Sequence, residues 1–260
     1  MIIVLYLRRL TIYITQLLLA LGLNSAQADT VSIAVAANFT EVAKELAVAF
    51  RNKTGHEATL SFGSSGQLYT QIRQNAPFQI FLSADDARTK LLVREGLGIS
   101  GEEFTYAIGK LVLWSKKPEL SANEETLKHG AFTKIAIANP VTAPYGAAAI
   151  EVMRAINVYD ALTPKIVQGN NIAQAFQFVD TENAELGFVA LSQLYGHSEG
   201  SRWIIPATYY PAIRQNALLL KTGENNHAAI TFMTFLKSMN ARAIIQKYGY
   251  ETDLIAGEIK

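Results

Sequence analysis

The sequence predicts an α/β protein whose chain folds into two lobes, each a mainly parallel sheet flanked by helices, with a hinge of two strands between them. Two observations predict this fold class. Short apolar segments rich in β-branched residues alternate with segments of helical periodicity, which is typical of parallel strands covered by helices. The alternation occurs in two series, and the apolar segment Lys110–Ser115 separates them. The 260 residues suffice for two lobes of about 100–150 residues each.

The first series contains three short apolar strands, each followed by a helix. The strands are Val31–Ala36, Ala58–Phe62 and Ile80–Ser83. Asn38 and Glu41 have the spacing of a capping box, so we expect the first helix to begin there and to run through Phe50. The second helix follows the loop Gly63–Gly66, and we expect Ser83 to cap the third.

The second series repeats this order after Lys110–Ser115. Its strands are Lys134–Ala138, Lys165–Val167, Leu186–Ala190 and Trp203–Ile205. Segments of helical periodicity end near Ile156 and Val179 and follow the first two of these strands. The second lobe is therefore expected to have the same strand–loop–helix construction as the first.

The last part of the chain leads back to the first lobe. Ile213–Leu220 is an apolar strand, and Ala228–Tyr248 predicts one long helix that Gly249 ends. We therefore expect residues 29–109 and 216–260 to form lobe 1 and residues 110–215 to form lobe 2, so that the chain crosses between the lobes twice.

Residues 1–28 have the pattern of a secretory signal. Arg8 and Arg9 precede the uncharged, mostly apolar segment Leu10–Leu23, and Ser25-Ala26-Gln27-Ala28 supplies small residues for cleavage after Ala28. The apolar run of 14 residues is shorter than the roughly 20 residues that a membrane-spanning helix needs. The pattern favours the general secretory route over the twin-arginine route and predicts a mature chain that begins at Asp29.

Composition excludes several classes of protein. The chain has no cysteine, which excludes disulfides, thiolate metal sites, a cysteine nucleophile and a lipid-modified cysteine at the cleavage point. Its 4 histidines show no metal-ligand spacing. With 23 Lys+Arg and 22 Asp+Glu the net charge is +1, and removal of Arg8 and Arg9 changes it to −1. A balance this close to zero does not indicate a nucleic-acid partner.

Four predicted helix starts share one character. They follow predicted strands, contain no Lys or Arg, and comprise Asn38–Thr40, Gly63–Gly66, Ala143–Gly146 and Asn170–Ala173. The first turn of a helix exposes unpaired N–H groups and a partial positive charge. Two of the four starts fall in each lobe, at the carboxyl ends of strands, where ligands bind in open α/β sheets. The pattern therefore predicts a site for a small anion bound by uncharged donors.

Several blocks of the sequence resemble the periplasmic molybdate-binding proteins of ABC transporters. The blocks span the chain after residue 28 and are Ile33–Thr40, Ser61–Leu68, Phe81–Asp85, Asn139–Pro140 with Ala143–Gly146, and Leu186–Ala190. The resemblance implies the type II periplasmic binding protein fold with molybdate or tungstate in the cleft. It also implies a monomer that delivers this oxyanion to a membrane permease, without catalytic activity, a cofactor or a nucleic-acid partner, and with molybdenum bound only as the oxyanion.

The resemblance also assigns the ligand contacts. It places Asn38, Ser65, Tyr145 and Ile172 at positions that bind the oxyanion in the family. One position departs from the family, because Ala190 stands where some members have a ligand-binding tyrosine. Tyr145 in turn stands where those members have a small residue. We therefore hypothesise that the Tyr145 hydroxyl replaces the donor missing at Ala190.

Two alternatives remain open. A protein of the same architecture can bind sulfate, phosphate or another oxyanion, because donor geometry and cavity size are not readable from sequence. The segment Gly196-His197-Ser198-Glu199-Gly200 matches the G-x-S-x-G pattern of serine hydrolases, with Ser198 as nucleophile. That pattern requires a strand before the serine and a helix after it, whereas here a predicted short helix, Leu191–Tyr195, precedes and the predicted strand Trp203–Ile205 follows. The segment is thus a weak indication of a secreted hydrolase.

Overall fold

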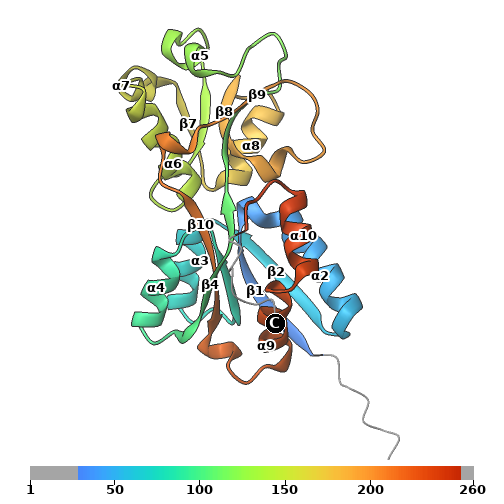
Figure 1. Cartoon of the computed structure of the whole chain (residues 1–260). Coiled ribbons are helices and arrows are strands. Elements are labelled where there is room, and N and C mark those ends of the chain that lie inside the picture. Colours follow the sequence, from blue (N-terminus) through green and yellow to red (C-terminus); the bar gives the residue numbers. More distant parts are fainter. Residues whose placement is uncertain (1–28, 253–260) are drawn as a thin grey trace, which may run out of the picture.

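The computed structural model describes residues 29–252 as two α/β lobes stacked along the long axis of the molecule (Figure 1). The predicted signal segment, residues 1–28, lies outside the described residues. In the part of the chain that is described, no helix has the length and apolar character that crossing a membrane requires. The two-lobed α/β fold class predicted from sequence is confirmed.

The first lobe contains a five-stranded sheet in the order β2-β1-β3-β10-β4. Its strands are β1 (Thr30–Ala36), β2 (Glu57–Gly63), β3 (Ile80–Ser83), β4 (Gly98–Gly109) and β10 (Ile213–Leu220). Its helices are α2 (Thr40–Thr54), α3 (Ser65–Arg73), α4 (Ala87–Arg94), α9 (His227–Leu236) and α10 (Met239–Lys247). β1 pairs in parallel with β2 and β3, whereas β10 is antiparallel to β3 and β4.

The second lobe repeats this plan with the strand order β7-β6-β8-β5-β9. Its strands are β5 (Leu111–Ser115), β6 (Ile135–Ala138), β7 (Ile166–Gly169), β8 (Leu186–Ala190) and β9 (Ser201–Ile204). Its helices are α5 (Glu124–His129), α6 (Pro144–Ala155), α7 (Tyr159–Leu162) and α8 (Ile172–Asp180). β6 is parallel to β7 and β8, and β5 is antiparallel to β8 and β9. Both sheets are therefore mixed rather than mainly parallel.

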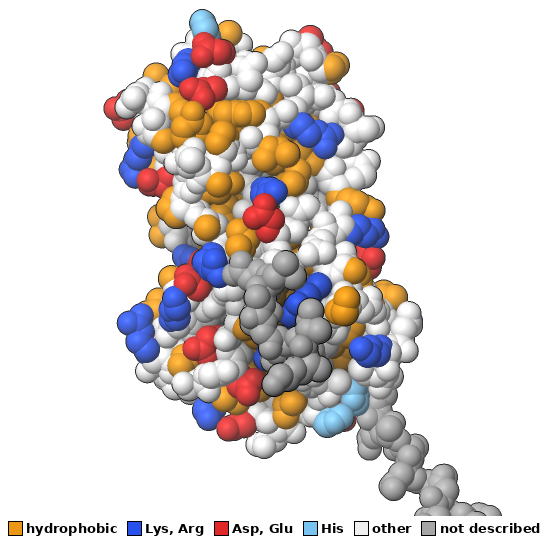
Figure 2. Space-filling model, viewed as in Figure 1, with side chains coloured by type: hydrophobic (Ala, Val, Ile, Leu, Met, Phe, Trp, Pro, Cys, Tyr) orange, Lys and Arg blue, Asp and Glu red, His pale blue; other side chains and the backbone are white. Residues whose placement is uncertain are grey.

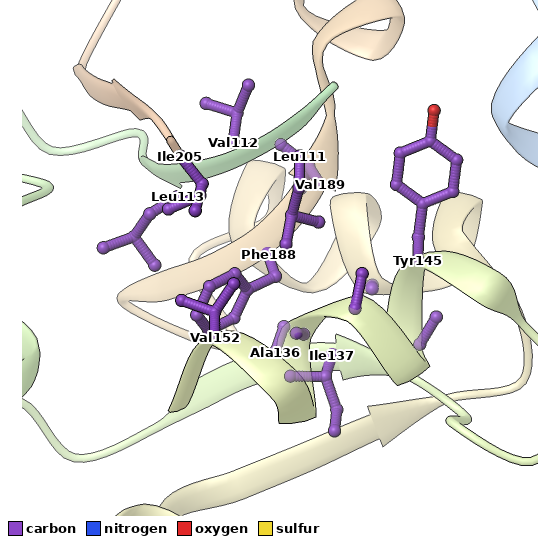
Figure 3. Close-up of a cluster of buried hydrophobic side chains, with 14 of the residues drawn as sticks. Leu111, Val112, Leu113, Ala136, Ile137, Tyr145, Val152, Phe188, Val189 and Ile205 are labelled. Atoms are coloured by element: carbon purple, nitrogen blue, oxygen red, sulfur yellow. The ribbon is translucent and has the colours of Figure 1, made fainter. Parts of the chain in front are cut away.

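Apolar strands form the core of each lobe. In the second lobe, Leu111, Leu113 and Phe188 are fully buried between the sheet and α6 (Figure 3). The chain passes from β4 to β5 through the single residue Lys110 and returns after β9 into β10. The Leu111 N–H donates to the Tyr210 hydroxyl at 3.0 Å, which ties these two crossings together. We call β4, Lys110, β5 and the start of β10 the hinge segments.

The prediction of one helix over Ala228–Tyr248 is wrong. The structure divides this segment into α9 and α10, because Ser238 leaves the helical conformation (φ −72°, ψ 157°) and caps the second helix by accepting the Ala241 N–H. Ser at this position competes with helix continuation through that side-chain bond. The predicted end is confirmed, since Gly249 follows α10 with φ +85°.

Two predicted helix caps are also wrong. α2 begins only at Thr40, after a 3-10 turn η1 (Ala37–Phe39), and the Asn38 side chain makes no capping bond. α4 begins at Ala87, and the N–H of Arg88 is accepted by Asp85 and not by Ser83. At Asn38 the side chain is instead committed to contacts with the hinge, which local sequence spacing does not reveal.

Candidate ligand site between the lobes

The four predicted helix starts meet around one small cavity between the lobes. Its walls are formed by η1, the start of α3, the start of α6 and the start of α8, together with Ala84. Asn38, Ser65, Tyr145 and Ile172 all line it. The space open to the centre of a water-sized sphere is about 10 Å³, which is of the order of one such sphere. A cavity of this size has room for about one water molecule and excludes an organic solute.

The first lobe contributes hydroxyl and main-chain donors at the start of α3. Ser64 caps this helix in a capping box with Gln67, which fixes the turn that presents Ser65. The Ser65 Oγ accepts the Ala84 N–H at 2.9 Å. Because a serine hydroxyl also carries one proton to donate, this contact orients the Ser65 hydroxyl and leaves its proton for a ligand oxygen.

The second lobe contributes main-chain donors at the starts of α6 and α8. Pro144 occupies the first turn of α6, so Tyr145 supplies the first N–H group of that helix. Asn171 caps α8 through the Gln174 N–H at 3.0 Å and leaves the N–H of Ile172 at the helix end. Within residues 29–252, the N–H groups of Ser65, Tyr145 and Ile172 form no hydrogen bond. Three helix ends thus direct unpaired donors at one point.

Asn38 lies at the cavity, but its amide group is already used. Its Nδ2 donates to the Gln215 Oε1 and to the Tyr250 hydroxyl, both at 2.9 Å. Its main-chain oxygen accepts from Ser192 Oγ at 2.8 Å and from Tyr250 at 2.9 Å. The Asn38 side chain therefore positions the loop at the cavity, and its amide hydrogens are not free for a ligand.

The Tyr145 hydroxyl points away from the other labelled side chains of the buried cluster of the second lobe (Figure 3). It accepts the Gln215 Nε2–H at 3.2 Å and interacts with the Tyr250 hydroxyl. It also packs on Gly109, where an added Cβ would lie 2.0 Å from the hydroxyl oxygen. These contacts engage the hydroxyl with the hinge, and the hypothesis that it replaces the donor missing at Ala190 stays a prediction.

Three buried tyrosines, Gln215, Asn38 and Ser192 form one hydrogen-bonded network, which we call the hinge network. The tyrosines are Tyr106, Tyr145 and Tyr250. Burial raises the pKa of each of the three hydroxyls above its ordinary value, and neighbouring tyrosines raise those of Tyr106 and Tyr145 further. The network therefore stays uncharged at neutral pH, so it carries no full charge that would attract or repel an anion in the cavity.

Direct bonds between the lobes flank the cavity. The Gly66 N–H of α3 donates to the Thr142 oxygen of the second lobe at 2.8 Å. Arg88 Nη2 donates to the Val141 oxygen at 2.9 Å while the same guanidinium pairs with Asp85. An added Cβ on Gly66 would lie 2.9 Å from the Thr142 Cα. The close contact between the start of α3 and Thr142 therefore requires glycine at position 66, and this contact sets the distance between the lobes.

Sequence reasoning missed Gln215 and Tyr250, which hold the cavity loop and the Tyr145 hydroxyl. A signal was present for the first, because Gln215 and Asn216 are two polar residues inside the otherwise apolar strand Ile213–Leu220, and both are buried. Buried polar side chains require partners, so their occurrence in a core strand indicates a polar network. Tyr250 follows the last helix and carried no comparable signal.

The structure places Ser198 in an exposed loop. This loop lies between the 3-10 turn η3 (Leu191–Leu194) and β9, which is the reverse of the strand–serine–helix order of a nucleophile elbow. A larger open groove of about 550 Å³ is lined by residues of both lobes, among them Glu41 of α2 and Asp180 of α8. The small cavity, by contrast, has no charged side chain among the described residues that line it and gathers the helix-terminal N–H groups, so it is the anion site that the geometry supports.

Comparison with known proteins identifies relatives over nearly the whole chain. Residues 31–251 match the family of bacterial extracellular solute-binding proteins. The chain is 51% identical over 240 residues to the molybdate-binding protein ModA of Rhodobacter capsulatus, covering 92% of this chain and 95% of that protein. It is 47% identical over 245 residues to ModA of Azotobacter vinelandii, covering 91% and 97% of the two chains.

Solved structures agree in fold. The periplasmic molybdate-binding protein of Azotobacter vinelandii superposes with a TM-score of 0.82 at 40% identity, covering 85% of this chain and 98% of that chain. The sulfate-binding protein SubI of Mycobacterium tuberculosis superposes with a TM-score of 0.70 at 11% identity, covering 88% of each chain. The second likeness is one of fold alone.

Proposed function

Because the chain belongs to the bacterial extracellular solute-binding proteins, and within them to the ModA family, we propose that its cavity binds molybdate between the lobes. The protein is a periplasmic molybdate-binding component of an ABC transporter, with the oxyanion as ligand and no cofactor. The observation that carries this function is the convergence of three unpaired helix-terminal N–H groups and the Ser65 hydroxyl on one small uncharged cavity.

Uncharged donors suit a fully desolvated oxyanion. Each ligand oxygen needs hydrogen-bond donors, because a buried charge without them is strongly destabilised. Helix ends supply such donors together with a partial positive charge. Charged side chains of both signs are interspersed over the face shown in Figure 2. The described part of this face therefore has no patch of purely positive charge that would attract an anion. Supported by this arrangement, Ser65, Tyr145 and Ile172 bind the oxyanion, the last two through main-chain N–H groups, and Asn38 holds the loop beside it.

Binding is coupled to closure of the lobes. Donors from lobe 1 (residues 29–109 and 216–260) and lobe 2 (residues 110–215) contact the ligand together only when the lobes approach. A ligand with contacts specific to the closed form shifts the equilibrium towards it. The closed monomer then presents molybdate, or tungstate of the same shape and charge, to the membrane permease. The mature chain begins at Asp29 after cleavage behind Ala28 and has no enzymatic role.

Calorimetric titration of the mature protein with molybdate, tungstate, sulfate and phosphate tests this function. We expect saturable binding of molybdate and tungstate, a higher melting temperature on binding, and no saturation by sulfate or phosphate at the same concentrations. Saturation by sulfate without a response to molybdate would overturn the assignment. Hydrolysis of a model ester that Ser198→Ala abolishes would support the hydrolase alternative instead.

A further inference from the structure

Two histidines and an aspartate meet at the far end of the first lobe, remote from the oxyanion cavity. The His56 Nε2 lies 3.1 Å from the His227 Nδ1. A carboxylate oxygen of Asp29 completes a group of ligand atoms that all lie within 4.8 Å of one another. Figure 2 shows histidine surface at this end of the molecule, beside the start of β1. The group brings together three chain segments distant in sequence.

The backbone holds these groups in place. Asp29 lies beside His56 because the Glu57 N–H donates to the Asp29 oxygen at 3.0 Å, continuing the parallel pairing of β1 and β2. The Asp29 N–H donates to the His56 Nδ1 at 3.1 Å. Asn226, which caps α9, donates to the Thr30 oxygen at 3.1 Å and so fixes the start of the helix that carries His227.

Burial further limits the movement of the cluster. His56 is 7% exposed and packs against Phe50, with ring centroids 6.1 Å apart. Its ring meets that of His227 edge-on, with centroids 5.1 Å apart and an interplanar angle of 70°. His227 is exposed and borders an open groove with Asp29 and Lys221. One ligand is thus rigid, and the other two reach solvent, where an ion can enter.

We propose that Asp29, His56 and His227 bind a divalent transition-metal ion such as Zn²⁺. Two imidazole nitrogens and a carboxylate form a donor set that zinc prefers, with solvent as the fourth ligand. Two nitrogens bound to one zinc at about 2.0–2.1 Å in tetrahedral geometry lie about 3.3 Å apart, close to the 3.1 Å observed. The ammonium of Lys221 borders the groove and is paired with Glu224 at 3.3 Å.

The proton balance of binding follows from the hydrogen bonds. Without metal, the His56 Nδ1 accepts from Asp29, so the proton of this imidazole lies on Nε2 and is donated to the His227 Nδ1. When the ion binds Nε2, this proton moves to Nδ1. In the mature chain the Asp29 nitrogen is the α-amino group, which is an ammonium at neutral pH. Binding of the ion therefore releases one proton from this ammonium to solvent, and the resulting amine accepts the Nδ1–H of His56. The mature chain is therefore the form to test.

A second cluster of possible ligands differs in one respect. Asp180, His197 and Glu199 also lie within 4.8 Å of one another through one ligand atom each. There the Lys116 Nζ contacts the Asp180 Oδ1 at 3.0 Å and neutralises the carboxylate that an ion would need. The cluster at Asp29 has no cation bound to its carboxylate among the described residues, and it provides the better site.

Titration of untagged, chelator-treated mature protein with ZnCl₂ tests the site. We expect one saturable site, a higher melting temperature with zinc, and at least a tenfold loss of zinc affinity in His227→Gln and in His56→Gln. His129→Gln is the matched control, because it removes an exposed histidine of the other lobe and should leave zinc binding unchanged.

Two outcomes overturn the metal site. One is the absence of saturation up to millimolar zinc, which would leave a hydrogen-bonded histidine pair only. The other is equal zinc affinity in the His227→Gln variant and the parent protein. Molybdate titrations of the same proteins separate this proposal from the oxyanion function, because His227→Gln should bind molybdate with the parent affinity whether or not zinc binds.

Discussion

Replacement of Tyr145 by phenylalanine removes one hydroxyl that links the second lobe to the hinge. The Gln215 Nε2–H, which now donates to this hydroxyl at 3.2 Å, loses its acceptor in the closed form. Tyr145 is 1% exposed and Gln215 is fully buried, so water does not replace the lost partner there. A buried donor left unpaired costs about 1–3 kcal/mol.

We expect this cost to appear in ligand affinity, because the bond joins Tyr145 of the second lobe to β10, a strand of the first-lobe sheet, and opening exposes Gln215 to water. A closed form destabilised by about 1–3 kcal/mol weakens molybdate binding by about 5- to 150-fold. Calorimetric titration of Tyr145→Phe measures this, with Tyr159→Phe, a change at a half-buried tyrosine remote from the cavity, as the control.

The alternative outcome is clear. If Tyr145→Phe lowers the melting temperature of the ligand-free protein but leaves the molybdate Kd within twofold, the hydroxyl stabilises open and closed forms equally. The hinge network then plays no part in closure. A second check is Gly109→Ala, whose Cβ would lie 2.0 Å from the same hydroxyl. Its effect should be smaller in the Tyr145→Phe background, since the two residues are in contact.

The remaining predictions concern the cavity, the lobe contact, a helix cap and pH. Ser65→Ala should weaken molybdate binding about 10- to 100-fold in a titration, because a hydrogen bond to a charged group contributes about 1.5–3 kcal/mol; parent affinity would exclude Ser65 from the site. Gly66→Ala should weaken binding without a comparable loss of ligand-free stability, because its Cβ would lie 2.9 Å from the Thr142 Cα across the closed interface. Ser238→Ala should lower the free energy of unfolding by about 1 kcal/mol in urea denaturation and leave molybdate affinity unchanged. The raised tyrosine pKa values of the hinge network mean that stability is fully present below the ordinary value of about 10 and falls above it; denaturation between pH 7 and pH 11 should show this, and a decline that begins near neutrality would point to other groups.

Periodicity predicted the strands of both sheets well where apolar residues are continuous. Ile80–Ser83, Leu186–Ala190 and Ile213–Leu220 are strands with those limits in the structure. β4 was missed because its pairing with β10 gives it strand conformation over a segment that is half exposed and rich in glycine and glutamate. Strand partners distant in sequence override local propensity in such a segment.

The site was predictable in its location and less so in its chemistry. Helix starts at the carboxyl ends of strands converge for topological reasons, so four sequence loops sufficed to indicate the cavity. The direction of each side chain depends on partners from the hinge and from the end of the chain. Asn38 turns to Gln215 and Tyr250, and the Tyr145 hydroxyl turns to Gln215. Neither partner lies near these residues in sequence, so local sequence could not predict these contacts.

The contacts beside the cavity explain how uncharged donors select an ion by size. The Gly66–Thr142 bond and the packing of Tyr145 on Gly109 fix how closely the lobes approach, and both depend on backbone atoms or on a buried network. The spacing of donors in the closed form is therefore set by the protein and not by the ligand. An ion that is too small leaves donors unpaired at a cost of about 1–3 kcal/mol each, and one that is too large prevents the Gly66–Thr142 bond. With a net charge of only +1 over the whole chain, discrimination between oxyanions of equal charge rests on this fixed spacing.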